Sequence, residues 1–107
     1  MNYLSYSNVS IVNIEGYKSR DNTCIRDGNI VTVSCEVYDM SVVATGVYFN
    51  IPEGYRPTKH IVNILGYVEY GGSIQPSMFS IATNGNVNIK HGGGLTTQIG
   101  FACTYHV

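Results

Sequence analysis

Residues 30–37 read IVTVSCEV, and this stretch decides the fold class of the chain. Its apolar side chains recur at every second position from Val31 to Val37, with polar residues between them. Successive side chains of a β-strand point to opposite faces, so this period of two predicts a strand with one buried face. The same pattern predicts about eight strands, at 9–14, 22–26, 30–37, 43–49, 60–69, 77–83, 86–91 and 97–106.

Short turns separate these strands. Asp27-Gly28 and Asn84-Gly85 favour two-residue hairpin turns, because both central residues of such turns need positive φ. Many short strands with such turns, and no helical periodicity, predict an all-β antiparallel β-sandwich of jelly-roll-like topology. The 107 residues match one domain, spanning 1–107.

Strand 60–69 is apolar on both faces. We expect Val62, Ile64 and Val68 to face the core, and the other face then carries the remaining apolar residues, Ile61, Leu65 and Tyr67. An outer face of this kind must be covered. A subunit interface through these three residues is the favoured interpretation, and an overhanging loop is the alternative.

The composition excludes several classes of protein. Six Lys and Arg residues spread along a chain of net charge −1 do not form the basic patch of a nucleic-acid binder. No apolar stretch is long enough to span a bilayer, so no membrane insertion is expected. The N-terminus has neither the basic start nor the apolar core of a secretory signal. Charged residues make up only 12%, which favours a surface partly buried against copies of the same chain.

The chain carries no catalytic or metal-binding motif. Its three cysteines include no CxxC pair, which argues against a zinc site and favours buried thiols made in a reducing cytoplasm. Three scattered histidines, His60, His91 and His106, lack the spacing of ligands. No metal, cofactor or catalytic residue is therefore predicted, although a glycosidase carboxylate pair hidden in the fold stays an alternative.

Two segments carry a resemblance. The first is the loop motif, residues 51–57 (IPEGYRP), and the second is residues 81–89 (IATNGNVNI), which follow about one strand pair later. With residues 27–33 (DGNIVTV) upstream and Tyr105 near the end, this order resembles the C-terminal head domains of bacteriophage tail fibres and baseplate receptor-binding proteins, of the type found in phages and prophages of Gram-positive bacteria. The resemblance covers roughly residues 26–107.

The resemblance implies a β-sandwich head, 9–107, that forms a homotrimer and binds host cell-wall or cell-surface saccharide without catalysis. Residues 1–8 would then be the stub of an upstream shaft. It also implies a place at the tail tip of a virion, next to other phage tail proteins, after synthesis in the bacterial cytoplasm. A purely structural trimerising component, a glycan-cleaving domain and a bacterial surface protein outside any phage remain alternatives.

The loop motif itself is expected to be structural. Pro52 and Pro57 fix its backbone, Gly54 permits a tight turn beside Tyr55, and Arg56 can bond loop carbonyls or a carboxylate.

Strand parity predicts the binding end. If consecutive strands are antiparallel, both termini, the 27–28 turn, the 50–59 loop and the 84–85 turn share one end. Loops 15–21, 38–42, 70–76 and 91–96 share the other, which would be the exposed tip. Rings that stack on sugars and groups that bond hydroxyls gather there. The predicted saccharide-binding residues are Tyr17, Arg20, Tyr38, Asp39, Tyr70 and His91.

Overall fold

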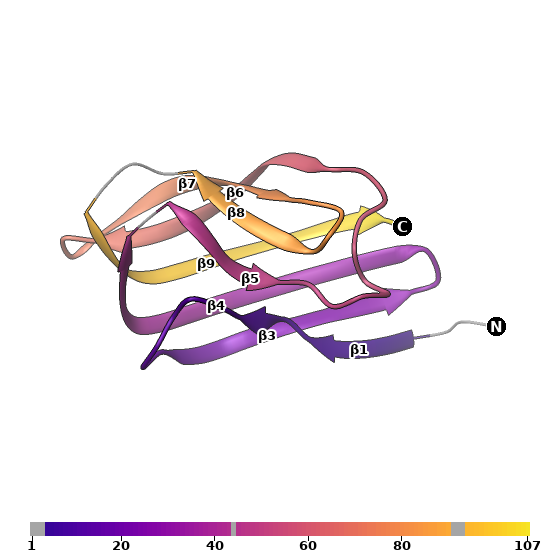
Figure 1. Cartoon of the computed structure of the whole chain (residues 1–107), viewed down its shortest axis with the longest axis horizontal. Helices are drawn as coiled ribbons and strands as arrows, with labels where there is room; N and C mark the ends of the chain where they lie inside the picture. Colours follow the sequence, from indigo (N-terminus) through magenta and orange to yellow (C-terminus); the bar gives the residue numbers. More distant parts are fainter. Residues whose placement is uncertain (1–3, 44, 91–93) are drawn as a thin grey trace.

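The chain forms a single antiparallel β-sheet (Figure 1). It is known from a computed structural model that describes residues 4–43, 45–90 and 94–107. None of these described residues lies in a helix, so none of them forms a helix that could cross a membrane. The nine strands are β1 (Leu4–Asn8), β2 (Ser10–Ile11), β3 (Lys18–Asp27), β4 (Ile30–Val43), β5 (Gly46–Asn50), β6 (Ile61–Tyr70), β7 (Ser73–Ile81), β8 (Asn86–Lys90) and β9 (Leu95–His106).

The sheet curls until its two edges nearly meet. Its strand order is β1-β3-β4-β9-β6-β7-β8-β5-β2, so β1 and β2 form opposite edges. Only Val9 separates these two strands in the sequence, and its side chain is buried. The N-terminal segment therefore pairs with β3 at one edge and continues onto β5 at the other. The expected two-layer sandwich is thus wrong in form: one nearly barrel-shaped sheet removes most free edges instead.

Several strands are longer than expected because β-bulges replace loops. β4 continues through residues 38–42, where a register shift between Tyr38 and Val42 accompanies a positive φ at Asp39. The bulge absorbs an extra residue without ending the strand. Likewise, the expected 70–76 loop is only the turn at Gly71 and Gly72, and β3 already begins at Lys18.

The core follows the predicted alternation, with one exception in β6. Val31, Val33 and Val37 are fully buried, as expected. In β6, however, a register shift between Ile61 and Ile64, with a positive φ at Asn63, reverses the strand's sides. Val62 is 58% exposed and Ile61 packs against the core, so both orientations predicted from the sequence are wrong.

The two ends of the sheet are arranged as strand parity predicts. Every recorded pairing is antiparallel, which places the start of β1, the end of β9 and the turns at 28–29 and 82–85 at one end. The start of β3 and the β6–β7 turn lie at the other end (Figure 1). We call these the terminal end and the far end.

Candidate functional site

A shallow groove of about 440 Å³ crosses the outer face of β3, β4, β9 and β6. Registers place Glu36, Gly100 and Tyr67 in one row across three of these strands. The next row toward the terminal end has Ser34 and Ala102 on β4 and β9. Small residues thus form the floor, and larger side chains stand at both sides. The lining comprises Asp21, Ser34, Cys35, Glu36, Leu65, Gly66, Tyr67, Gly100, Phe101 and Ala102.

Gly100 gives the tyrosine ring its place. A Cβ atom on Gly100 would lie 2.3 Å from the Tyr67 ring, far inside van der Waals contact. The missing side chain therefore lets the ring lie across β9 and reach Glu36 on β4. An aromatic ring that covers a glycine on a neighbouring strand is a known device for shaping sheets.

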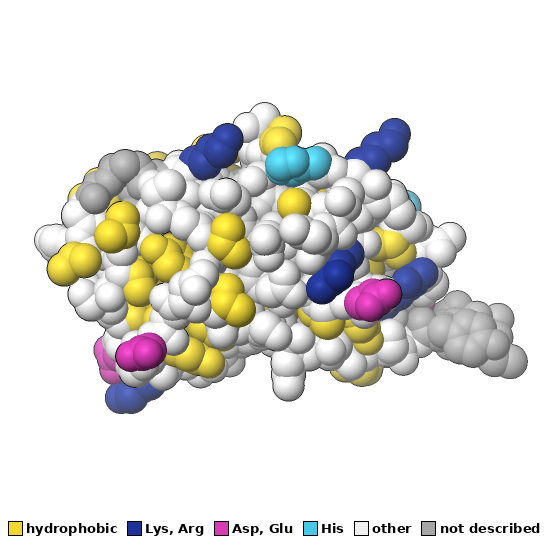
Figure 2. Space-filling model, viewed as in Figure 1, with side chains coloured by type: hydrophobic (Ala, Val, Ile, Leu, Met, Phe, Trp, Pro, Cys, Tyr) yellow, Lys and Arg dark blue, Asp and Glu magenta, His cyan; other side chains and the backbone are white. Residues whose placement is uncertain are grey.

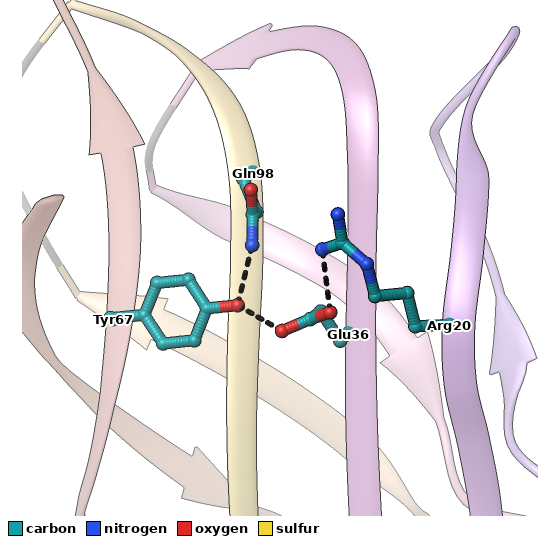
Figure 3. Close-up of polar contacts among 4 residues, drawn as sticks. All are labelled: Arg20, Glu36, Tyr67 and Gln98. Carbon is teal, nitrogen blue, oxygen red and sulfur yellow. Dashed lines mark hydrogen bonds and ion pairs between the residues drawn. The ribbon is translucent and has the colours of Figure 1, made fainter. Parts of the chain in front are cut away.

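Four side chains from four neighbouring strands form a continuous polar network over this floor (Figure 3). The Tyr67 hydroxyl donates to Oε2 of Glu36 at 2.5 Å and accepts from Nε2 of Gln98 at 2.7 Å. Arg20 donates to the other carboxylate oxygen, Oε1, at 2.8 Å. Both oxygens of Glu36 are thus held in place before any ligand arrives.

The network keeps Glu36 ionised. The hydrogen bond from Tyr67, followed by that from Arg20, lowers the pKa of the Glu36 carboxyl below its ordinary value of 4.5. Burial and the same carboxylate raise the pKa of Tyr67, so its hydroxyl keeps its proton. A fixed carboxylate accepts hydrogen bonds well, whereas a general acid of a glycosidase needs a raised pKa. This central carboxyl is therefore suited to recognition rather than proton donation.

This lowered pKa predicts a pH dependence of stability. A carboxyl whose pKa is lower in the folded state stabilises the fold above its unfolded pKa, and the stabilisation fades as pH falls through the folded value. We expect the stability difference between the wild type and Glu36→Gln to be constant above pH 4.5 and to shrink below it. Urea unfolding at a series of pH values measures this difference. A difference that stayed constant down to the acid limit would contradict the network.

The structure brings together some of the residues predicted to bind saccharide. The guanidinium of Arg20 lies 4.1 Å from the centre of the Tyr38 ring, and Lys18 forms an ion pair of 3.1 Å with Asp39. Tyr17, which is 38% exposed, immediately precedes β3.

The other two predicted residues do not join this group. Tyr70 ends β6 and packs partly against the core. His91 lies outside the described residues.

Three residues of the network escaped prediction as ligand contacts. Glu36 and Gln98 appear in the sequence only as polar positions of alternating strands, and Tyr67 appears as an interface residue. Their convergence depends on the registers of three strand pairs. The one local signal is Gly100, a glycine within an otherwise regular alternation, which marks a close approach by another group.

The loop motif of residues 51–57 packs against the second motif, and both lie at the terminal end. Arg56 donates through Nε to the carbonyl of Ile51 at 2.8 Å, one of the roles expected for it. The Ile51 amide in turn donates to the carbonyl of Gly85 at 2.8 Å.

Two further bonds hold this loop. The Tyr55 amide donates to the Pro52 carbonyl at 3.1 Å, and Arg26 donates to the carbonyl of Gly54 at 2.7 Å. Pro57, at the loop's end, is buried. The motif therefore closes the fold on the opposite end from the predicted tip.

No metal site is formed by the part of the chain that the structure describes: no group of three His, Cys, Asp or Glu side chains converges there. The described cysteines are free, and burial raises the pKa of Cys24 and of Cys103 to about 11. Thiols in such surroundings are packing groups rather than nucleophiles.

The fold and groove define a small all-β domain, built on one nearly closed antiparallel sheet, with a preformed polar surface. No protein-family model matches the chain, and no curated protein matches it. Among solved structures, the receptor binding protein (gp15) of Listeria phage PSA is similar, with a TM-score of 0.62 and 14% sequence identity. The match covers 94% of this chain and 66% of that one, so the chain spans about two-thirds of that protein's length. At this identity the likeness shows a common fold.

Proposed function

We propose that this chain is a non-catalytic receptor-binding domain of a phage tail, which recognises saccharide on the host cell surface through its outer-face groove. The observation that carries the proposal is the network around Glu36, where acceptors and donors are fixed above a floor of small residues. The shared fold with a protein named as a phage receptor binding protein supports the same role.

The groove suits a sugar because both parts of sugar recognition are present. Ser34, Asp21 and Glu36 offer groups that bond hydroxyls, and Leu65 and Tyr67 offer an apolar wall for C–H faces. Arg20, Tyr38 and Asp39 extend the polar surface toward the far end. The proposed saccharide site thus includes the sheet face as well as the predicted tip.

We also propose a homotrimer, assembled through an apolar strip on β6 and β7. Leu65 is 68% exposed and Val62 is 58% exposed. Met78 is paired with Leu65 across the strands and lines a small hollow with Val62. Figure 2 shows how sparse charged side chains are on one face of the molecule. Such a strip suits burial against another copy, and Val62 replaces Ile61 in the predicted interface.

In this proposal the domain sits at the tail tip, with its terminal end toward other tail proteins. The expected shaft stub, residues 1–8, includes β1, which pairs with β3 from Leu4 to Asn8. A preceding shaft would therefore enter at the terminal end and leave the far end exposed.

Two measurements test the proposal. Binding of the purified chain to an array of bacterial cell-surface polysaccharides is expected to be selective and to be lost in Glu36→Ala, with Glu69→Ala as the control. Uniform absence of binding would favour a purely structural tail component. Light scattering is expected to give roughly 35 kDa, three times the chain mass of 11.7 kDa, and a monomer would overturn the trimer.

A further inference from the structure

A second hollow lies at the seam where the curled sheet fails to close. β1 pairs with the second half of β3, from Thr23 to Asp27, and the last bond across this edge runs from the Val9 amide to the Asn22 carbonyl at 2.9 Å. Beyond Val9 the chain turns to β5, where Val12 donates to the Tyr48 carbonyl. In the described ranges, no strand pairs with this edge of β3 at residues 18–21. The two sides of the sheet separate there.

The seam hollow measures about 550 Å³ and is mostly polar. Tyr17 and Arg20, both predicted from the sequence to bind saccharide, line it. Amide and hydroxyl side chains supply most of the rest. Its lining residues are Asn8, Val9, Ser10, Ile11, Tyr17, Ser19, Arg20, Asp21, Asn22 and Thr23.

One group in this hollow is left without a partner. Oδ1 of Asn22 is buried and accepts no hydrogen bond within the described part of the protein. Such an acceptor costs free energy unless something donates to it. Two neighbours are already fixed: Asp21 accepts from Thr23 at 2.9 Å, and Arg20 is held by Glu36 and Tyr38. The hollow thus combines rigid walls with one unused acceptor.

The shape of the edge distinguishes between two kinds of ligand. A free strand edge can pair with an extended peptide, but regular pairing needs an even ladder. Here the register shifts between Ser19 and Asp21, and this bulge interrupts the ladder at the hollow. A compact ligand with several hydroxyl groups fits better: it can donate to Asn22 while its apolar face lies on the Tyr17 ring.

We propose that the seam hollow is a second saccharide site, which takes a single neutral sugar unit by donation to Asn22 and stacking on Tyr17. The proposal rests on the saccharide-binding function and adds to it. Arg20 lies between the two sites, since it lines the seam and also bonds Glu36 on the outer face. Two neighbouring sites would let the domain read two units of one polysaccharide.

Titration of the whole ¹⁵N-labelled chain with free monosaccharides tests this inference. Glucose, galactose, rhamnose, N-acetylglucosamine and N-acetylgalactosamine are added singly to millimolar concentration. At least one of them is expected to shift the amide signals of Tyr17, Ser19 and Asn22. Asn22→Leu and Tyr17→Ala are each expected to weaken that binding about tenfold, the loss of one hydrogen bond or one stacked face.

The control is Tyr6→Ala, which removes an exposed tyrosine of β1 outside the hollow and is expected to bind as the wild type does. The spectrum of each variant shows whether it is folded, and Tyr17 lies outside the strands. Shifts confined to Glu36 and Gly100 would overturn the seam site but leave the proposed function standing. A complete lack of shifts would also overturn the seam site, while the polysaccharide array decides the proposed function separately.

Discussion

Alanine in place of Gly85 is expected to destabilise the domain by about 3 kcal/mol, from a strained backbone and an overpacked site together. Gly85 has a φ of +90°, which side chains rarely adopt. A Cβ atom there would also lie 2.3 Å from the Ile51 carbonyl oxygen and 2.6 Å from Nε of Arg56. That oxygen is backbone, and it accepts the Arg56 bond, so neither group can move away without breaking the loop.

Gly28→Ala is the matched control for this change. Gly28 also has a positive φ, +62°, but nothing lies within 4 Å of its added Cβ atom. Its cost should be the backbone term alone, about 1 kcal/mol. Urea unfolding measures both variants, with Gly85→Ala expected at the lower midpoint. Equal losses would mean that the contact between the two motifs contributes nothing to stability.

Local patterns in the sequence predict most of the strands and both ends of the sheet. Side-chain alternation identifies Val31, Val33 and Val37 as core because a strand's period of two depends only on the local backbone. Parity then follows from antiparallel neighbours. The failures occur at bulges, as in β6, where Asn63 takes a positive φ and exchanges the sides of Ile61 and Val62. A single inserted residue leaves no mark on composition or period until the pairing partner is known.

The groove is harder to predict than the fold. Glu36, Gln98 and Tyr67 are separated by more than thirty positions from one another, and only the registers of β4, β9 and β6 bring them together. Closure of the sheet depends in the same way on Val9, which continues the chain from one edge to the other. Each feature is set by tertiary pairing, about which a single sequence carries little direct information.

Gly100→Ala is expected to abolish the outer-face site while leaving the fold intact. The added Cβ atom meets the Tyr67 ring at 2.3 Å, and this ring lies on the outer face, where it can swing into solvent. Displacing it breaks the bonds to Glu36 and Gln98 together. Saccharide binding should fall about a hundredfold, as two hydrogen bonds of ordinary strength predict.

The pKa of Glu36 gives this prediction a readout that needs no ligand. The bond from Tyr67 is the largest cause that lowers this pKa, so its loss should raise the pKa toward the ordinary value of 4.5. Carboxyl chemical shifts followed through a pH titration measure it. Gly94→Ala is the control, because nothing lies within 4 Å of its added Cβ atom, and it should leave both the pKa and binding unchanged. If the pKa stayed low in Gly100→Ala, the ring would have kept its place, and the glycine could not be what lets Tyr67 reach Glu36.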